Sequence, residues 1–114
     1  MATILYGRGL HLRMLMNVQI PVDVGNAKVK DGSLGRDIQR ILEAQRPEAA
    51  YFLEDNGTRT AVVVVDCADE SAMPAIAEPW FLAFNAKVRC HPAMIAEDLA
   101  AAGPLIEEAS KSFG

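Results

Sequence analysis

The sequence predicts an α+β fold in which strands and helices follow in the order β-α-β-β-α-β, with an additional helix at the C-terminus. Residues 49–66 form two strand-like segments joined by a turn, and this hairpin is preceded and followed by segments with helical spacing. Because crossover connections between strands are right-handed, this order gives a four-stranded antiparallel sheet with both helices on one face. The first and third strands are then central.

The hairpin of residues 49–66 is the strongest local signal. Asn56 and Gly57 tolerate positive φ, as a two-residue hairpin turn requires. The second arm, residues 60–65, is almost wholly apolar and β-branched. We therefore expect a central strand that is covered on both faces.

The first strand is expected over residues 12–20 and ends before Pro21. Apolar and polar side chains alternate along it, so it has two different faces. One face carries Met14, Met16, Val18 and Ile20, and the other carries Arg13, Leu15, Asn17 and Gln19.

A polar connector containing Gly25 and Gly32 is expected after this strand. Ser33 is a suitable N-cap for the first helix, whose apolar stripe runs through residues 34–45. Pro47 then separates this helix from the hairpin.

The second half of the chain repeats the alternation of helix and strand. Ser71 can cap a second helix, which Pro79 is expected to break between Ala77 and Trp80, because proline lacks the N–H that a helix interior needs. A fourth strand is expected over residues 87–91. Helical spacing resumes near Met94, is interrupted at residues 103–104, and ends in an apolar stripe.

Size and composition limit the possible functions. The 114 residues carry a net charge of −4, which argues against nucleic acid as the main partner. The sequence has no apolar run long enough for a membrane span and no signal-peptide layout, so we expect a cytoplasmic protein with no membrane partner. Cys67 and Cys90 are expected to be reduced. Residues 1–11 are interpreted as an N-terminal extension and residues 12–114 as one domain.

The sheet face opposite the helices is the part of the fold that bears on function. Its expected apolar members, Leu15, Leu53, Val62 and Val64, have nothing else in the chain to cover them. Exposed apolar surface of this kind is costly in water and prone to aggregation. We therefore expect a homodimer joined through this face.

The chain resembles the dimeric α/β-barrel superfamily, in which two ferredoxin-like subunits pack sheet against sheet around a cavity. Within it, the chain is most similar to a group of small uncharacterised bacterial proteins. The matching segments are residues 47–52 (PEAAYF), 73–86 (MPAIAEPWFLAFNA), 92–94 (PAM) and 97–99 (EDL). The resemblance implies a ferredoxin-like fold and a dimer. It implies no particular activity, because this superfold supports many.

The candidate site lies on the same face. Its expected ligand-binding residues are Arg13, Asn17, Gln19, Tyr51 and Arg89, and its expected proton acceptors are His91 and Asp66. Hydrogen-bond donors on neighbouring strands could hold a carboxylate or an enolate in an apolar barrel. Alternatively, the same residues only surround a dimer interface, where Arg and Tyr are common.

Two functions therefore remain open at this point. One is a cofactor-free enzyme or binding protein for a small organic acid or a phenolic compound. The other is a structural or interaction module whose barrel is filled by side chains. No metal site is expected, because neither His11 nor His91 has a ligand-spaced partner, although His91 alone leaves a haem ligand open.

Overall fold

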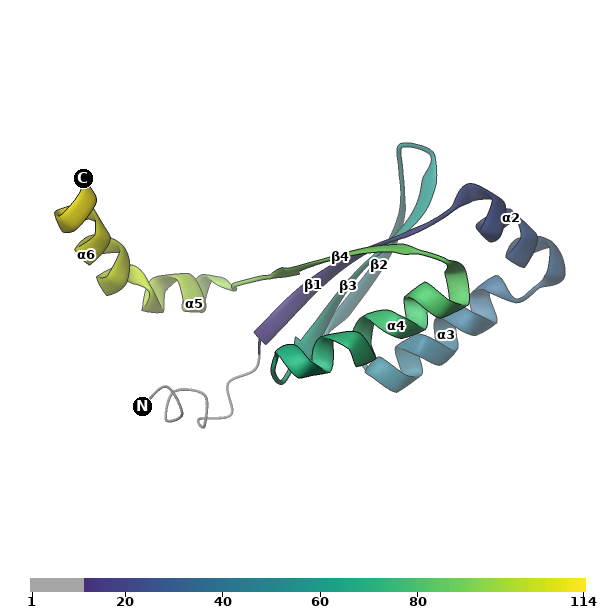
Figure 1. Ribbon diagram of the computed structural model, residues 1–114, viewed down its shortest axis with the longest axis horizontal. Coiled ribbons are helices and arrows are strands. Elements are labelled where there is room, and N and C mark those ends of the chain that lie inside the picture. Colours follow the sequence, from purple (N-terminus) through teal and green to yellow (C-terminus); the bar gives the residue numbers. More distant parts are fainter. Residues whose placement is uncertain (1–11) are drawn as a thin grey trace.

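The computed structural model describes residues 12–114, which form a sheet with helices on one side and a helical arm at one end (Figure 1). The elements are β1 (Leu12–Ile20), α2 (Val22–Asp31), α3 (Leu34–Gln45), β2 (Ala49–Asp55), β3 (Thr58–Cys67), the 3₁₀ turn η1 (Glu70–Ala72), α4 (Met73–Phe84), β4 (Lys87–Pro92), α5 (Ala96–Ala101) and α6 (Gly103–Phe113). The α+β class is as predicted. The expected extension, residues 1–11, and His11 within it lie outside the described residues.

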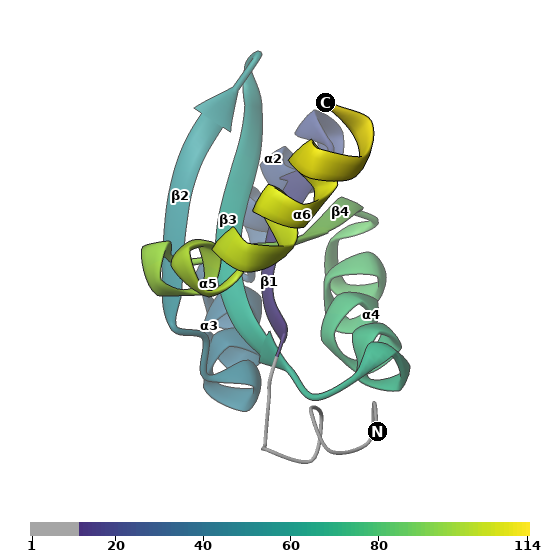
Figure 2. The same cartoon turned by 90° about the vertical axis from the view of Figure 1, so that its left-hand side faces the viewer.

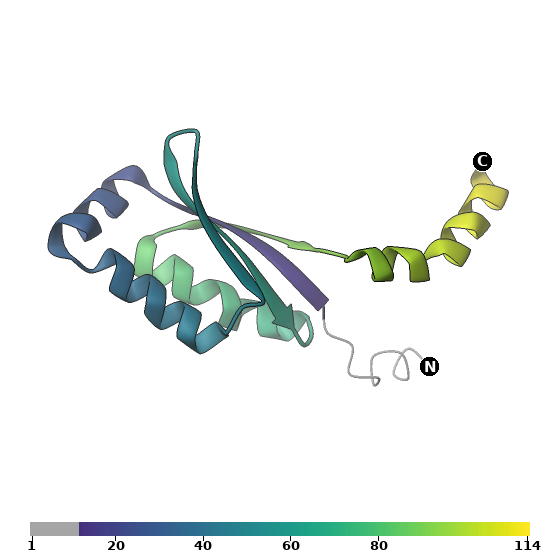
Figure 3. The same cartoon turned by 180° about the vertical axis from the view of Figure 1, so that it is seen from behind.

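The four strands of the described chain form one antiparallel sheet in the order β2-β3-β1-β4. β1 lies between β3 and β4, so that Met16 is paired with Val63 on one side and with Cys90 on the other. The first and third strands are therefore central, as predicted. α3 and α4 lie on one face of this sheet (Figure 3).

The hydrophobic core lies between the sheet and these two helices. Met14, Met16, Val18 and Ile20 are buried on the helix side of β1, which confirms the alternation predicted for this strand. Trp80 and Phe84 of α4 are also fully buried, with ring centroids 5.9 Å apart. These two rings are therefore packing residues of the core, whereas Phe81 on the same helix is exposed.

The hairpin between β2 and β3 has the predicted turn. Asn56 and Gly57 have φ values of 53° and 77°, and Asp55 is paired with Thr58 across the turn. Only one face of β3 is fully covered in the single chain, however. Val63 and its neighbours on the helix side are buried, whereas Val62 and Val64 on the other face are half-buried.

The connector predicted between the first strand and the first helix is wrong, because residues 22–31 form the helix α2. Its C-terminus is capped by Gly32 with a φ of 79°, and the Ser33 N–H donates to the Lys28 carbonyl at 2.9 Å. Periodicity could not reveal this helix, because Val22 and Val29 are exposed and the helix has no apolar stripe.

Gly25 has a packing role within α2. A Cβ atom at this position would lie 2.7 Å from a guanidinium nitrogen of Arg59. Glycine therefore allows the Arg59 side chain of β3 to cross α2 closely, and the same side chain donates to Asn26 Oδ1 at 3.0 Å.

The break predicted at Pro79 is also wrong. α4 is continuous from Met73 to Phe84, with Pro79 inside it. A proline at this position removes one intrahelical hydrogen bond and crowds the preceding turn.

Gln45, the last residue of α3, forms two hydrogen bonds to α4 next to Pro79. Its Nε2 donates to the Ile76 carbonyl at 2.6 Å, and its Oε1 accepts from Trp80 Nε1 at 3.2 Å. One side-chain amide thus joins α3 to α4 on both sides of Pro79.

The helix caps differ in part from the prediction. Asp69, rather than Ser71, caps the start of the second helical segment, because its side chain accepts a hydrogen bond from the Ser71 N–H. Ser33 precedes α3 as predicted, but its side chain makes no capping hydrogen bond.

α5 and α6 form an arm that projects beyond the end of the sheet and lies nearest the viewer in Figure 2. The two helices meet at Ala102, next to the interruption predicted at residues 103–104. No arm residue is buried. The Cα radius of gyration is 17.6 Å, whereas a compact chain of this length has about 13 Å. The arm therefore lies outside the compact body.

Candidate functional site

All the residues predicted for the site lie on the sheet face opposite α3 and α4, which we call the open face. Strand pairing arranges this face in three rows that run from β2 to β4. The rows are Leu53–Thr60–Gln19–Lys87, Tyr51–Val62–Asn17–Arg89 and Ala49–Val64–Leu15–His91. Arg13 and Asp66 are paired beyond the third row. The position of all the predicted site residues on one face agrees with the alternation in the sequence.

Arg13 is held by two carboxylates of its own chain. Its Nε donates to Glu48 Oε1 at 2.7 Å, and its Nη1 lies 3.6 Å from Asp98 Oδ2. The hydrogen bond to Glu48 is the main cause that raises the pKa of Arg13 above its ordinary value. Because these acids already balance its charge, Arg13 is a weaker anion site than the sequence indicated.

Asn17 and Arg89 are the neighbouring polar side chains of the open face that lack partners among residues 12–114. They are directly opposite each other on β1 and β4. Asn17 Oδ1 is buried and accepts no hydrogen bond from residues 12–114. Arg89 is exposed and forms no ion pair within the same part of the chain. A ligand that carries an anionic group and a hydrogen-bond donor could satisfy both side chains.

Gln19 is only partly free to bind a ligand, because its amide already interacts with Asp55. Its Nε2 lies 3.4 Å from Asp55 Oδ2, so this long hydrogen bond turns the amide towards the hairpin. Lys87, its neighbour on β4, is exposed and is unpaired among the described residues.

Tyr51 is not brought together with Arg89 in the single chain. They share a row, but β3 and β1 lie between them, and a strand spacing of about 4.8 Å places their backbones about 14 Å apart. Tyr51 lies on the β2 edge and is 63 % exposed.

His91 and Asp66 are likewise separated. Asp66 lies opposite Arg13, and His91 lies opposite Leu15 on the other side of β1. From the strand spacing and the rise per residue, their backbones are about 12 Å apart. They cannot act as a hydrogen-bonded acid–base pair in one chain.

The open face carries unbalanced positive charge along β4. Lys87, Arg89 and His91 are all exposed and form no ion pair with residues 12–114. Cys90, between the last two, faces the core side. Burial raises the pKa of its thiol, so it is a poor candidate for a nucleophile.

Two hollows of the described chain lie away from Asn17 and Arg89. A hollow of about 550 Å³ lies between α3 and α4 and is lined in part by Arg40, Ala44 and Leu82. A smaller one, of about 230 Å³, lies at the β2 edge beside Phe52 and Ile38. Neither hollow is the barrel cavity expected from the sequence, which stays a prediction.

Glu48 and Asp98 were not expected from the sequence as partners of Arg13. Glu48 immediately precedes β2, and its position beside the end of β3 follows from the Glu48 N–H donating to the Val64 carbonyl at 2.8 Å. Asp98 also accepts a hydrogen bond from the Ile95 N–H at 3.1 Å at the start of α5, where a carboxylate favours the helix dipole. Its contact with Arg13 is long-range, and no local pattern signals it.

Two further observations concern metal binding and membrane spans. Among residues 12–114, no group of three or more His, Cys, Asp or Glu side chains could hold a metal ion. In this part of the chain, no helix combines the length and the apolar character needed to cross a membrane. Comparison of the chain with models of protein families, curated proteins and solved structures finds no match.

Proposed function

We propose that the chain acts as a homodimer that binds or transforms a small organic acid or phenolic compound without a cofactor. The compound would lie between the two open faces. The observation that carries this proposal is the mixed character of the open face. Apolar side chains of β1 and β3 lie beside exposed cations of β4, and no helix of the described chain packs over them (Figures 1 and 3).

The proposed architecture is the dimeric α/β barrel of ferredoxin-like subunits. Starting from β4, the strand order is 4-1-3-2, with both long helices on one face, and this order is consistent with the ferredoxin-like split βαβ arrangement. Two such sheets packed face to face lie about 10 Å apart, with side chains from both filling or lining the space between them.

Charge favours one way of joining the two sheets. A two-fold axis parallel to the strands places β4 over the partner's β2, whereas a perpendicular axis places β4 over the partner's β4. On the open face β4 presents Lys87, Arg89 and His91 and no acid, and β2 presents Asp55 and no base. Opposite charges favour the parallel axis.

This arrangement also completes the predicted site. A two-fold axis parallel to the strands preserves the rows, so the partner's Tyr51 lies over Arg89. The separation of about 14 Å within one chain then becomes a neighbouring position across the interface. The site would be composed of β4 and β1 from one subunit and β2 from the other.

The side chains of this composite site suit an anion. Arg89 offers a planar fork for a carboxylate, and Asn17 and the partner's Tyr51 can orient a second polar group. His91 is the side chain best suited to exchange a proton near neutral pH. Asp66, at the end of the barrel, is the second proposed proton acceptor.

The alternative function is a structural or interaction module with a filled barrel. The ion pairs of Arg13 with Glu48 and Asp98 favour it, because they show that charges on this face can be balanced without a ligand. The two functions differ in what they predict for added acids.

Thermal unfolding in the presence of small carboxylic and phenolic acids tests the proposal. We expect at least one class of acid to raise the Tm of the native protein and to stabilise Arg89→Ala much less. Arg40→Ala is the matched control, because Arg40 lies on α3, on the other side of the sheet, and is exposed. The Arg40→Ala protein should respond like the native protein.

Two results would count against ligand binding. Equal stabilisation of the native and Arg89→Ala proteins by every acid would remove Arg89 from the site. A complete lack of response, together with a dimer whose barrel is filled by side chains, would favour the structural module.

A further inference from the structure

The C-terminal arm, α5 and α6, presents an apolar side that nothing in the described chain covers. Leu105, Ile106 and Phe113 follow helical spacing along α6, and all three are exposed, Phe113 to 90 %. A row of large apolar side chains on a helix that projects from the body indicates a protein contact.

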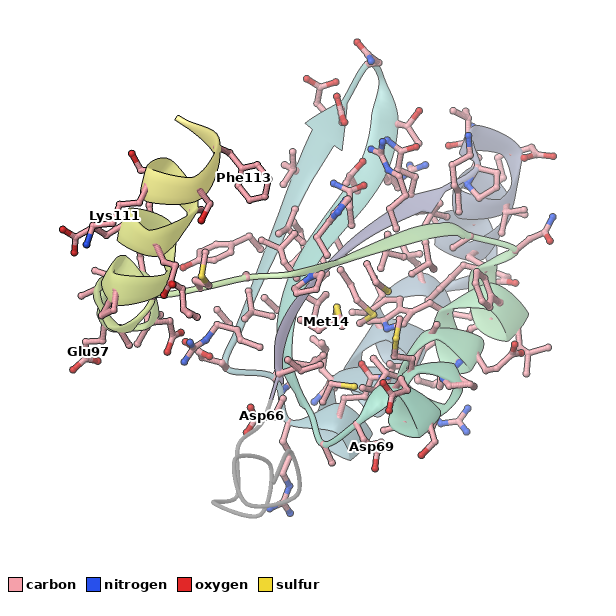
Figure 4. The ribbon with its side chains drawn as sticks, turned by 60° about the vertical axis from the view of Figure 1, so that its left-hand side comes forward. Met14, Asp66, Asp69, Glu97, Lys111 and Phe113 are labelled. Carbon is pink, nitrogen blue, oxygen red and sulfur yellow. The ribbon has the colours of Figure 1, made fainter. Side chains whose placement is uncertain are left out.

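The arm lies on the same side of the sheet as the open face. In Figure 4 the arm and α3/α4 are on opposite sides of the sheet. The same view shows Phe113 on the side of α6 towards the sheet and Lys111 on the side away from it. The apolar side of the arm therefore faces the space in front of the open face.

Arg13 fixes the base of the arm to the end of this face. Its Nη1 lies 3.6 Å from Asp98 Oδ2 in α5, while its Nε is bound to Glu48 before β2. The arm thus leaves the sheet at the end where His91 and Arg13 lie, rather than at the hairpin end.

The charges of the arm complement those of the open face. Glu97, Glu107 and Glu108 form no ion pair within residues 12–114, and neither do Lys87 and Arg89 of β4. Counting Asp98 and Lys111, residues 96–113 carry four acids and one base, a net charge of −3. Unpaired acids on the arm and unpaired bases on the open face favour contact between copies of this chain over contact with an acidic partner.

We propose that the arm of each subunit packs against a second copy of this chain and closes the end of the barrel at which His91 lies. This inference rests on the homodimer of the proposed function. With the two-fold axis parallel to the strands, both arms leave from the same end of the assembly. Each arm then crosses in front of the other subunit, near Ala49 at the start of that subunit's β2. The ligand site is incomplete without this arm, because it would otherwise be open to water at the His91 end.

Sedimentation of full-length variants tests the role of the arm. Ile106→Asp/Phe113→Asp places two carboxylates on its apolar side, and Lys111→Asp makes the same change in net charge on the other side. We expect the first to raise the dimer dissociation constant at least tenfold and the second less than twofold. Circular dichroism should be unchanged in both, because no residue of α6 is buried.

The open-face variant Val62→Asp separates this inference from the proposed function. If Val62→Asp dissociates the dimer while Ile106→Asp/Phe113→Asp leaves its dissociation constant within twofold, the arm inference is overturned and the proposed dimer stands. A native chain that sediments as a monomer at micromolar concentration overturns both.

Cross-linking tests where the arm lies. In a Cys90→Ser background, a chain with Ser112→Cys is mixed with a tagged chain that has Ala49→Cys, and a short bis-maleimide is added. We expect a mixed product, which is necessarily intermolecular, and no such product when Gln39→Cys on α3 replaces Ala49→Cys. The opposite pattern would place the arm on the helix side of the partner and overturn the closure of the barrel end.

Discussion

Gln45 shows how one polar side chain can join two helices of the core. Its amide joins the Ile76 carbonyl and the Trp80 indole N–H, which lie on either side of Pro79. Trp80 is fully buried, so its N–H must be satisfied inside the protein. Gln45 is the last residue of α3, and this is why the end of that helix is tied to the middle of α4.

Gln45→Ala should therefore destabilise the protein. It leaves the buried Trp80 N–H without its partner, and such a loss costs about 1–3 kcal/mol. Chemical denaturation should show the decrease in the free energy of unfolding. Gln39→Ala is the control, because Gln39 is exposed on the same helix and bonds only to Glu43. If both variants lost equal stability, the bridge to α4 would have no special role.

Asp37 connects α3 to α2 through an ion pair. Lys28 Nζ donates to Asp37 Oδ2 at 2.8 Å, and this hydrogen bond lowers the pKa of Asp37 below its ordinary value. A lowered pKa in the folded state means that the stabilisation is present above the unfolded-state value of about 3.9. The stabilisation is lost as the pH falls through the lower folded-state value.

The expected result is a difference in acid sensitivity. Asp37→Asn should lose less stability than the native protein between pH 7 and pH 3, because its side chain no longer takes up a proton. Urea unfolding at the two pH values measures this difference. Glu43→Gln, which removes an exposed carboxylate from the same helix, should behave like the native protein. If Asp37→Asn and the native protein lost equal stability between the two pH values, the ion pair of Asp37 with Lys28 would not be a source of the acid sensitivity.

At the scale of elements, α4 is a continuous helix with a proline, Pro79, in its interior. Proline in a helix interior is about 3 kcal/mol less favourable than alanine. Pro79→Ala should restore an intrahelical N–H donor and raise the free energy of unfolding by up to about 3 kcal/mol. Thermal or urea unfolding would show it. A decrease in stability would mean that the fixed φ of proline, through the unfolded state, outweighs the missing hydrogen bond.

Most elements could be predicted because their signals are local. The alternation of Met14 and Met16 with Leu15, and the turn at Asn56-Gly57, depend only on neighbouring residues. α2 could not be predicted in the same way, because its Val22 and Val29 are exposed. The contact of Gln45 with α4 could not be predicted either, because Gln45 is 34 residues before Pro79 and is brought to this part of α4 only by tertiary packing.

The same distinction applies to the candidate site. Strand period predicted that Arg13, Asn17, Arg89 and His91 share one face, and strand pairing places Asn17 beside Arg89. The alternation along the strands could not predict that Glu48 and Asp98 form ion pairs with Arg13. These contacts depend on where the loop before β2 and the arm lie relative to the sheet. The alternation also could not predict that Tyr51 and Arg89 lie at opposite edges.

At the scale of the whole molecule, the open face and the arm pose the same physical problem. Both expose apolar side chains, and each also carries charges without partners in the described chain. Burying a large apolar side chain stabilises by about 1.5–3 kcal/mol, so several of them on two surfaces supply a substantial driving force for association. A dimer that uses both surfaces covers them at once.

The orientation of that dimer can be tested by exchanging charges between β4 and β2. If β4 lies over the partner's β2, Lys87 lies close to the partner's Asp55. Lys87→Asp and Asp55→Lys should then each weaken the dimer. An exposed ion pair contributes about 0.2–1 kcal/mol, and a two-fold dimer contains the pair twice, so each reversal should cost about 0.5–2 kcal/mol of association. The double variant should recover most of this loss. If β4 instead lay over the partner's β4, Lys87→Asp made in only one of two mixed chains would strengthen association, because it would place a carboxylate against the partner's β4, which carries Lys87, Arg89 and His91 and no acid. Sedimentation of the native, single, double and mixed proteins at low salt distinguishes the two orientations.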